Sequence, residues 1–110
     1  MRVSLKRSLR DPSPENRSAI AHLILVLHFP GAHSLKEKRQ ILSSLIGKVR
    51  ERYPVSAAET GYQDLWQRAL VEVVMVSSDP ILPPRIFGKI IDLVTSNTEI
   101  VLLDSHQESI

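Results

Sequence analysis

The architecture of this chain is clearest in one segment, PGAHSLKEKRQILSSLIGKVRERYPVSAAETGYQDLWQRA, which runs from Pro30 to Ala69. Ser34 and Glu37 form a capping-box pattern typical of a helix start. The residues that follow repeat at 3.6-residue spacing on one apolar face: Leu35, Leu42, Leu45, Ile46, Val49 and Tyr53. Pro54 cannot continue a helix, so the pattern predicts about five helical turns that end just before it.

The flanking segments read as strands. Residues 19–29 alternate, with Leu23, Leu25, Leu27 and Phe29 on one face and a mixed set with two histidines on the other. Further strands are predicted at 55–60, 68–76 and 100–103, and a second helix starts at Pro83 and Pro84. The order βαββαβ predicts an α+β, ferredoxin-like sandwich, in which two helices cover one face of a four-stranded antiparallel sheet.

Composition supports one domain and excludes some classes of protein. A length of 110 residues and 43% hydrophobic content fit a single folded unit. No apolar run is long enough to span a membrane, and the absence of cysteine excludes disulfides and thiolate chemistry.

The net charge of +2 is unevenly placed along the chain. Residues 1–18 carry five basic and two acidic side chains, so residues 19–110 are close to neutral. Residues 1–18 also contain a cluster of turn-forming and helix-breaking residues around Pro12 and Pro14. We therefore expect a flexible basic arm over 1–18, either a plain tail or a contact for nucleic acid, and a domain over 19–110.

The segment closely resembles the YlxP-like family of small bacterial domains of unknown function. The shared pattern is roughly PG-x-x-SLK-x-KR, then a helix, then V-S-x-A-E-x-x-x-Q-D-x-W-Q-R-A. The resemblance covers about residues 19–106 and implies a ferredoxin-like fold and a cytoplasmic bacterial protein without an assigned activity. Genes of the family often lie beside those for translation initiation and ribosome maturation factors, which implies a link to RNA or ribosomes by association only.

The first predicted helix carries the candidate partner-binding cations. Lys36, Arg39 and Arg50 project within about 60° of one another beside the apolar stripe, where they could follow phosphates or form a solvated flank. Lys38 instead falls inside the apolar arc. A buried ammonium needs a carboxylate or carbonyl partner, and Glu59 or Asp64 is expected to supply it.

The second polar cluster lies between the inner strands. An exposed Trp66 beside Arg68 could stack on a base, whereas a buried Trp66 would close the core. We expect Ser34, Glu37, Lys38, Gln63 and Asp64 to form a structural motif. Asp64 and Glu59 could act as an acid–base pair, but no nucleophile, phosphate loop or metal set accompanies them, so no catalytic residue and no cofactor are predicted.

The remaining features concern metals and self-association. Four histidines are scattered without a metal-binding pattern, although His22 could approach His106 across neighbouring strands. The sheet face away from the helices is expected to carry a contiguous apolar surface that forms a homodimer, through Ile20, Ile24, Val26, Leu70 and Val74.

Two functions follow from these features. The first is a non-enzymatic accessory protein that binds RNA or the ribosome through Lys36, Arg39, Arg50, Trp66 and Arg68. The alternative is a homo-oligomeric regulatory domain that binds a small molecule.

Overall fold

The computed structural model describes residues 19–110, so the basic arm expected over 1–18 lies outside the described residues. Six elements follow one another along the chain: β1 (Ala19–His28), α2 (Leu35–Arg52), β2 (Ser56–Gly61), β3 (Arg68–Ser77), α3 (Leu82–Thr95) and β4 (Val101–Ser109). None of the described helices is long and apolar enough to cross a membrane.

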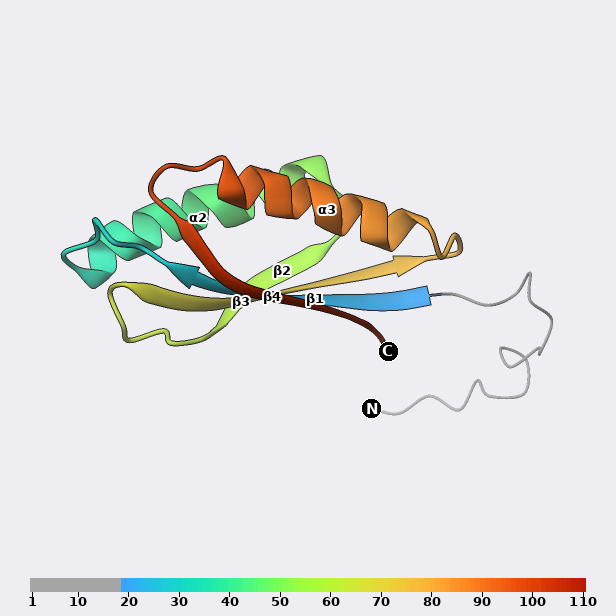
Figure 1. Cartoon of the computed structure of the whole chain (residues 1–110), viewed down its shortest axis with the longest axis horizontal. Coiled ribbons are helices and arrows are strands. Elements are labelled where there is room, and N and C mark those ends of the chain that lie inside the picture. Colours follow the sequence, from blue (N-terminus) through green and yellow to red (C-terminus); the bar gives the residue numbers. More distant parts are fainter. Residues whose placement is uncertain (1–18) are drawn as a thin grey trace.

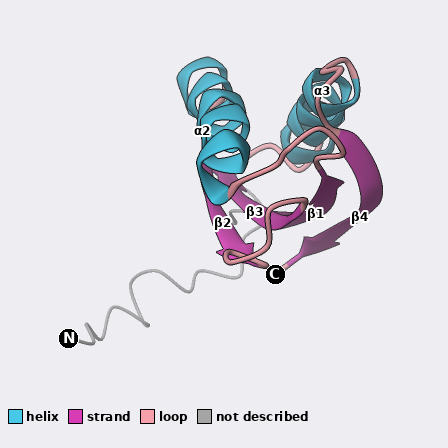
Figure 2. Cartoon of the chain, turned by 90° about the vertical axis from the view of Figure 1, so that its left-hand side faces the viewer, coloured by secondary structure: helices cyan, strands magenta, loops and turns pink. Residues whose placement is uncertain are grey.

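The strands form one antiparallel sheet in the order β2-β3-β1-β4. Both helices pack on the same face of this sheet, and the opposite face carries neither of them (Figures 1 and 2). We call that opposite face the open face. The predicted α+β, ferredoxin-like sandwich is confirmed.

The core lies between the sheet and the two helices. Alternate residues of the central strands are buried there, including Leu23, Leu25 and Leu27 of β1 and Val71, Val73 and Met75 of β3. The helices contribute Leu42, Leu45 and Val49 from α2 and Ile86, Phe87, Ile90 and Val94 from α3. This period-two and period-3.6 arrangement is the one that the sequence pattern predicts.

Strand β4 is longer than the sequence pattern indicates. It extends to Ser109 and pairs with β1 along most of its length, with one irregularity between Val26 and Leu27. Residues 104–109 are polar and exposed, so they lack the apolar alternation that identifies a strand. Backbone pairing to β1, rather than burial of side chains, accounts for this part of the strand.

Candidate functional site

The β2–β3 loop and the β1–α2 loop meet at one end of the molecule, which we call the hairpin end. It comprises residues 29–34, the first turn of α2 and residues 62–68. The backbone N–H of Phe29 donates to the Gln67 carbonyl at 3.0 Å. The Gln67 side-chain amide donates to the carbonyls of Pro30 at 3.3 Å and Ala32 at 3.2 Å. Gln67 therefore ties the two loops together.

Helix α2 starts at this end with a side-chain cap. The backbone N–H of Glu37 donates to Ser34 Oγ at 3.1 Å, so Ser34 is the N-cap residue. The Glu37 carboxylate accepts from the backbone N–H of His33 at 2.6 Å. In a capping box, the Glu37 carboxylate would accept from the backbone N–H of Ser34 itself. Here it accepts from His33, the residue before the cap, so a backbone donor next to the helix start is still satisfied.

Lys38 lies one turn into α2 and its side chain is 0% exposed. Its ammonium donates to the carbonyls of Tyr62 at 2.9 Å and Arg68 at 3.0 Å, with a longer contact of 3.5 Å to Gln63. Lys38 Nζ also lies 2.9 Å from Glu59 Oε2. This oxygen is buried and has no hydrogen-bonded donor among the described residues, so Lys38 provides its only compensating charge there.

The ammonium of Lys38 therefore holds both ends of the β2–β3 loop. Tyr62 has a positive φ of 57°, a conformation that a large side chain rarely adopts. Its carbonyl accepts from Lys38 and also from the backbone N–H of Leu65 at 3.0 Å. Within the described residues, Lys38 and Glu59 form the only lysine–carboxylate or arginine–carboxylate pair.

Asp64, the other carboxylate considered for Lys38, is exposed in the loop, so the partner is Glu59 instead. Gln63 is also exposed, and its side-chain amide donates to the Glu59 carbonyl at 3.0 Å. Because Glu59 is engaged by Lys38 while Asp64 faces solvent, the two carboxylates do not share the environment that an acid–base pair needs.

The loop presents three large side chains to solvent. Trp66 is 53% exposed, and Tyr62 and Leu65 are exposed to a similar degree. The Arg68 guanidinium lies over the Tyr62 ring, 5.8 Å from its centroid, in a cation–π arrangement. The site predicted from the sequence did not include Tyr62 and Leu65, because isolated apolar residues in a polar turn form no periodic pattern.

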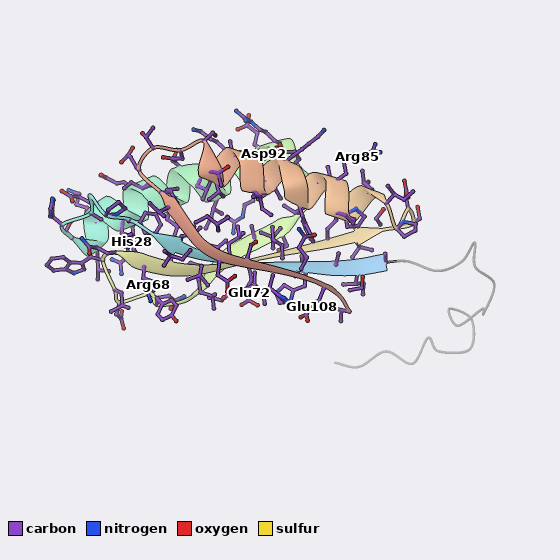
Figure 3. All side chains as sticks on the ribbon, in the orientation of Figure 1. His28, Arg68, Glu72, Arg85, Asp92 and Glu108 are labelled. Carbon is purple, nitrogen blue, oxygen red and sulfur yellow. The ribbon has the colours of Figure 1, made fainter. Side chains whose placement is uncertain are left out.

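A shallow hollow of about 440 Å³ lies at this end, lined by His28, Asp64, Leu65, Trp66, Gln67 and Arg68. His28 Nδ1 lies 2.9 Å from the Gln67 carbonyl, which can only accept, so Nδ1 carries the proton. Figure 3 shows His28 and Arg68 toward the same end of the sheet. The hollow thus combines one large aromatic side chain, a cation and a carboxylate.

The three candidate partner-binding cations on α2, Lys36, Arg39 and Arg50, differ in their contacts. Lys36 and Arg39 line an exposed strip with Gln40, Ser43 and Ser44, and neither makes an ion pair with a described residue. Arg50 instead donates from Nε, at 3.1 Å, and from a terminal nitrogen to the Ala57 carbonyl. Because β2 is an edge strand, this contact ties part of the Arg50 guanidinium to a sheet edge. Arg50 remains exposed and makes no ion pair with a described residue.

A second polar arrangement crosses the open face, away from the hairpin end. The Thr60 hydroxyl donates to Glu72 Oε2, and His22 Nε2 lies 2.8 Å from Glu72 Oε1. His22 Nδ1 lies 3.3 Å from Glu108 Oε1, and His106 Nε2 lies 3.5 Å from Glu108 Oε2. We call these five residues the polar row. It connects all four strands, and Figure 3 shows Glu72 and Glu108 on the open side of the sheet.

The polar row was only partly visible in the sequence. The sequence indicated that His22 could approach His106, and in the structure Glu108 contacts both of them. Glu108 is directly opposite His22 in the register, whereas His106 is opposite Ile24. The extension of β4 past Leu103 creates this pairing. Among residues 19–110, no group of three or more histidines and carboxylates is placed to hold a metal ion.

Glu72 has a pKa below its ordinary value of 4.5. The hydrogen bond from Thr60 is the main cause; burial opposes it, and the hydrogen bond and charge of His22 lower the pKa further. Because the pKa of Glu72 is lower in the folded chain than in the unfolded chain, its ionised carboxylate stabilises the fold at pH values above the unfolded pKa. This stabilisation is lost as the pH falls through the folded-state pKa.

We therefore expect Glu72→Gln to reduce stability at pH 7 and to have a progressively smaller effect as the pH falls below about 4.5. Urea-unfolding midpoints of the wild type and variant, measured from pH 7 downward, give this difference. Glu99→Gln, an exposed carboxylate outside the polar row, is the control. A Glu72→Gln effect that stays constant from pH 7 into the acid range would contradict the assignment.

This chain is similar to known proteins. The sequence profile of the family described as "Protein of unknown function (DUF503)" matches residues 20–107. The uncharacterized protein YlxP of Bacillus subtilis (strain 168) is 36% identical over 69 residues, which cover 63% of this chain and 75% of that protein. The de novo designed protein Foldit4 aligns over 86% of this chain and 97% of its own, with a TM-score of 0.48 and 8% identity. The profile match and the YlxP identity together show that this chain belongs to the DUF503 family of proteins of unknown function.

Proposed function

We propose that the hairpin end binds single-stranded RNA, with Trp66 stacking on a base and Arg68, Lys36 and Arg39 contacting the phosphate backbone. The observation that carries this proposal is the half-exposed Trp66 beside Arg68 on a loop held by a buried lysine. Proteins that bind single strands combine aromatic stacking platforms with cations that follow the backbone.

The fixed loop favours binding because little order must be gained. The Tyr62 and Arg68 carbonyls at either end of the loop are held by Lys38, and Gln67 is bonded to the neighbouring loop. A preorganised aromatic side chain loses less conformational entropy on binding than one on a mobile loop. The contacts around Lys38 and Gln67 thus support the surface that Trp66 presents.

The hollow beside Trp66 has the size and chemistry for one base. Its volume of about 440 Å³ lies within the range of small-ligand sites. Asp64 supplies an acceptor for a base amino group and Arg68 supplies a cation for a phosphate. Lys36 and Arg39, on the exposed strip of α2, add charge at the same end of the molecule.

RNA recognition through the open face is disfavoured by its residues. Ferredoxin-like RNA-binding domains stack bases on aromatic side chains of the central strands. The open face of β1 and β3 instead carries aliphatic residues, with histidine and glutamate at its centre. The association with ribosomes that the family resemblance implies would therefore involve the hairpin end.

Trp66 is the only tryptophan, so its fluorescence reports directly on the proposed contact. We expect a single-stranded RNA of about 10 nucleotides to quench it saturably at low salt, with weaker binding as the salt concentration rises. Mononucleotides are the comparison ligands. Saturable, salt-insensitive binding of a mononucleotide with no gain from a longer strand would favour the small-molecule alternative, and no quenching by any RNA would overturn the proposal.

Lys36 and Arg39, the two cations near the start of α2, should contribute to the salt dependence of RNA binding. We expect Lys36→Ala and Arg39→Ala each to weaken RNA binding and to reduce the slope of log affinity against log salt by roughly 0.7, the value for one phosphate contact on a single strand. Lys48→Ala, which removes an exposed cation from the same helix, and Lys89→Ala on α3 are matched controls. If neither Lys36→Ala nor Arg39→Ala changes the slope, these two side chains do not contact the RNA.

A further inference from the structure

We infer that the open face is a self-association surface, on which a second copy of this chain packs with its own open face. The helices leave this face of the sheet uncovered (Figure 2). Its aliphatic residues come from both central strands: Ile20, Ile24, Val26, Leu70, Val74 and Val76. Ile20, 38% exposed, and Val76, 63% exposed, lie directly opposite each other in the register.

The polar row at the centre of this face is already satisfied within the chain. His22 Nε2 and Nδ1 lie 2.8 and 3.3 Å from carboxylate oxygens of Glu72 and Glu108, and an imidazole that carries two protons donates to both. Thr60 donates to the second oxygen of Glu72, and His106 Nε2 lies 3.5 Å from the second oxygen of Glu108. Covering a polar group costs free energy mainly when it is left without a partner. The open face can therefore lose its water without leaving these atoms unpaired.

The same property argues against a nucleic acid as the occupant. A phosphate-binding surface needs free donors and an excess of positive charge. On the open face, the nitrogens of His22 lie against the carboxylates of Glu72 and Glu108, so the polar row offers no excess of positive charge. This separates the open face from the hairpin end, where Lys36 and Arg39 have no such partner.

The alternation of histidine and glutamate favours a second copy. A two-fold interface brings a patch against itself, so the patch must carry both signs of charge or none. A row that contains both can place an imidazole of one copy opposite a carboxylate of the other. The aliphatic residues on either side of the row supply the apolar part of such an interface.

The size of the face is also sufficient. Strands β1 and β3 have 10 residues each. At about 3.3 Å per residue and 4.8 Å between strands, the four-stranded face measures roughly 33 by 15–19 Å. Two such faces bury on the order of 1,000–1,200 Å², which is the lower end for a specific interface, so we expect a weak, concentration-dependent dimer.

Sedimentation velocity of the full chain, from about 1 to 200 μM, tests this inference. We expect the weight-average mass to rise with concentration toward twice the 12.4 kDa of one chain. Val76→Glu and Ile24→Glu should each raise the dimer dissociation constant at least about tenfold, because each introduces an unpaired charge into the contact. Ile81→Glu is the matched control, since Ile81 is 65% exposed and lies before α3.

Circular dichroism of each variant shows whether it is folded, and Val76→Glu changes a side chain exposed enough to leave the monomer intact. A wild-type chain that remains monomeric at 200 μM would overturn the inference. A dimer whose dissociation constant is unchanged in folded Val76→Glu and Ile24→Glu would also overturn it, because the contact would then lie elsewhere. Neither result bears on RNA binding at the hairpin end, so the two proposals fail independently.

Discussion

Replacing Lys38 by methionine should lower the free energy of unfolding by about 3–5 kcal/mol, the range for breaking a buried charge pair on one side. Methionine preserves much of the aliphatic volume but removes the ammonium. Glu59 Oε2 then remains buried without a compensating charge, and the carbonyls of Tyr62 and Arg68 lose their donor. Urea unfolding at pH 7 measures the loss.

Lys48→Met is the matched control, because Lys48 is exposed on the same helix and its replacement should change stability by less than about 0.5 kcal/mol. Adding Glu59→Leu to Lys38→Met should recover part of the loss, since it removes the uncompensated carboxylate. A Lys38→Met variant within about 1 kcal/mol of the wild type would show that the ammonium does not hold the loop.

Trp66→Ala should have the opposite profile, with a large effect on binding and a small effect on stability. Loss of one stacked base contact costs about 1–3 kcal/mol, which corresponds to roughly 5- to 150-fold weaker RNA binding. Because about half of Trp66 is exposed, we expect its removal to change the unfolding free energy far less than the Lys38 substitution. Fluorescence anisotropy of a labelled RNA measures the affinity, since the variant lacks its own tryptophan.

Two variants of the same loop sharpen this prediction. Trp66→Phe keeps an aromatic face and should retain most of the affinity. Leu65→Ala removes an equally exposed apolar side chain from the next position and should have the smaller effect. If Trp66→Ala and Leu65→Ala weaken binding equally, the loop contributes only general apolar contact and Trp66 does not stack on a base.

The fold could be predicted because its signals are local and periodic. The alternation in β1 and the 3.6-residue spacing in α2 each specify one buried face, and Ser34 and Pro54 bound the helix. Strand β4 was underestimated because its second half is held by backbone pairing to β1, which leaves no periodic pattern in polar side chains.

The candidate site could be predicted only in part, because its properties depend on contacts between distant segments. A lysine in an apolar arc indicates a buried ammonium, and Glu59 and Asp64 were the two expected partners. Only the fold shows that the partner is Glu59 and that loop carbonyls also surround the ammonium. Arg50 lies on the same helix ridge as Arg39, yet it is bonded to the edge of β2. The exposure of Trp66 follows from the loop conformation, which the sequence alone does not specify.

The Pro30–Ala69 segment therefore has two kinds of residues. Lys38, Glu59 and Gln67 hold the hairpin end together through bonds within the chain. Trp66, with Arg68 and the cations near the start of α2, remains on the surface of that assembly. A sequence pattern shared across a family can include both kinds, so the pattern alone does not identify the binding residues.

The position of the RNA contact is the central claim, and two-dimensional NMR of the isotope-labelled full chain tests it most directly. On addition of a single-stranded RNA of about 10 nucleotides, we expect the largest shifts at the Trp66 indole N–H, at backbone amides of residues 62–68 and at the first turn of α2. Shifts confined to the open face, or no shifts at any RNA concentration, would contradict it.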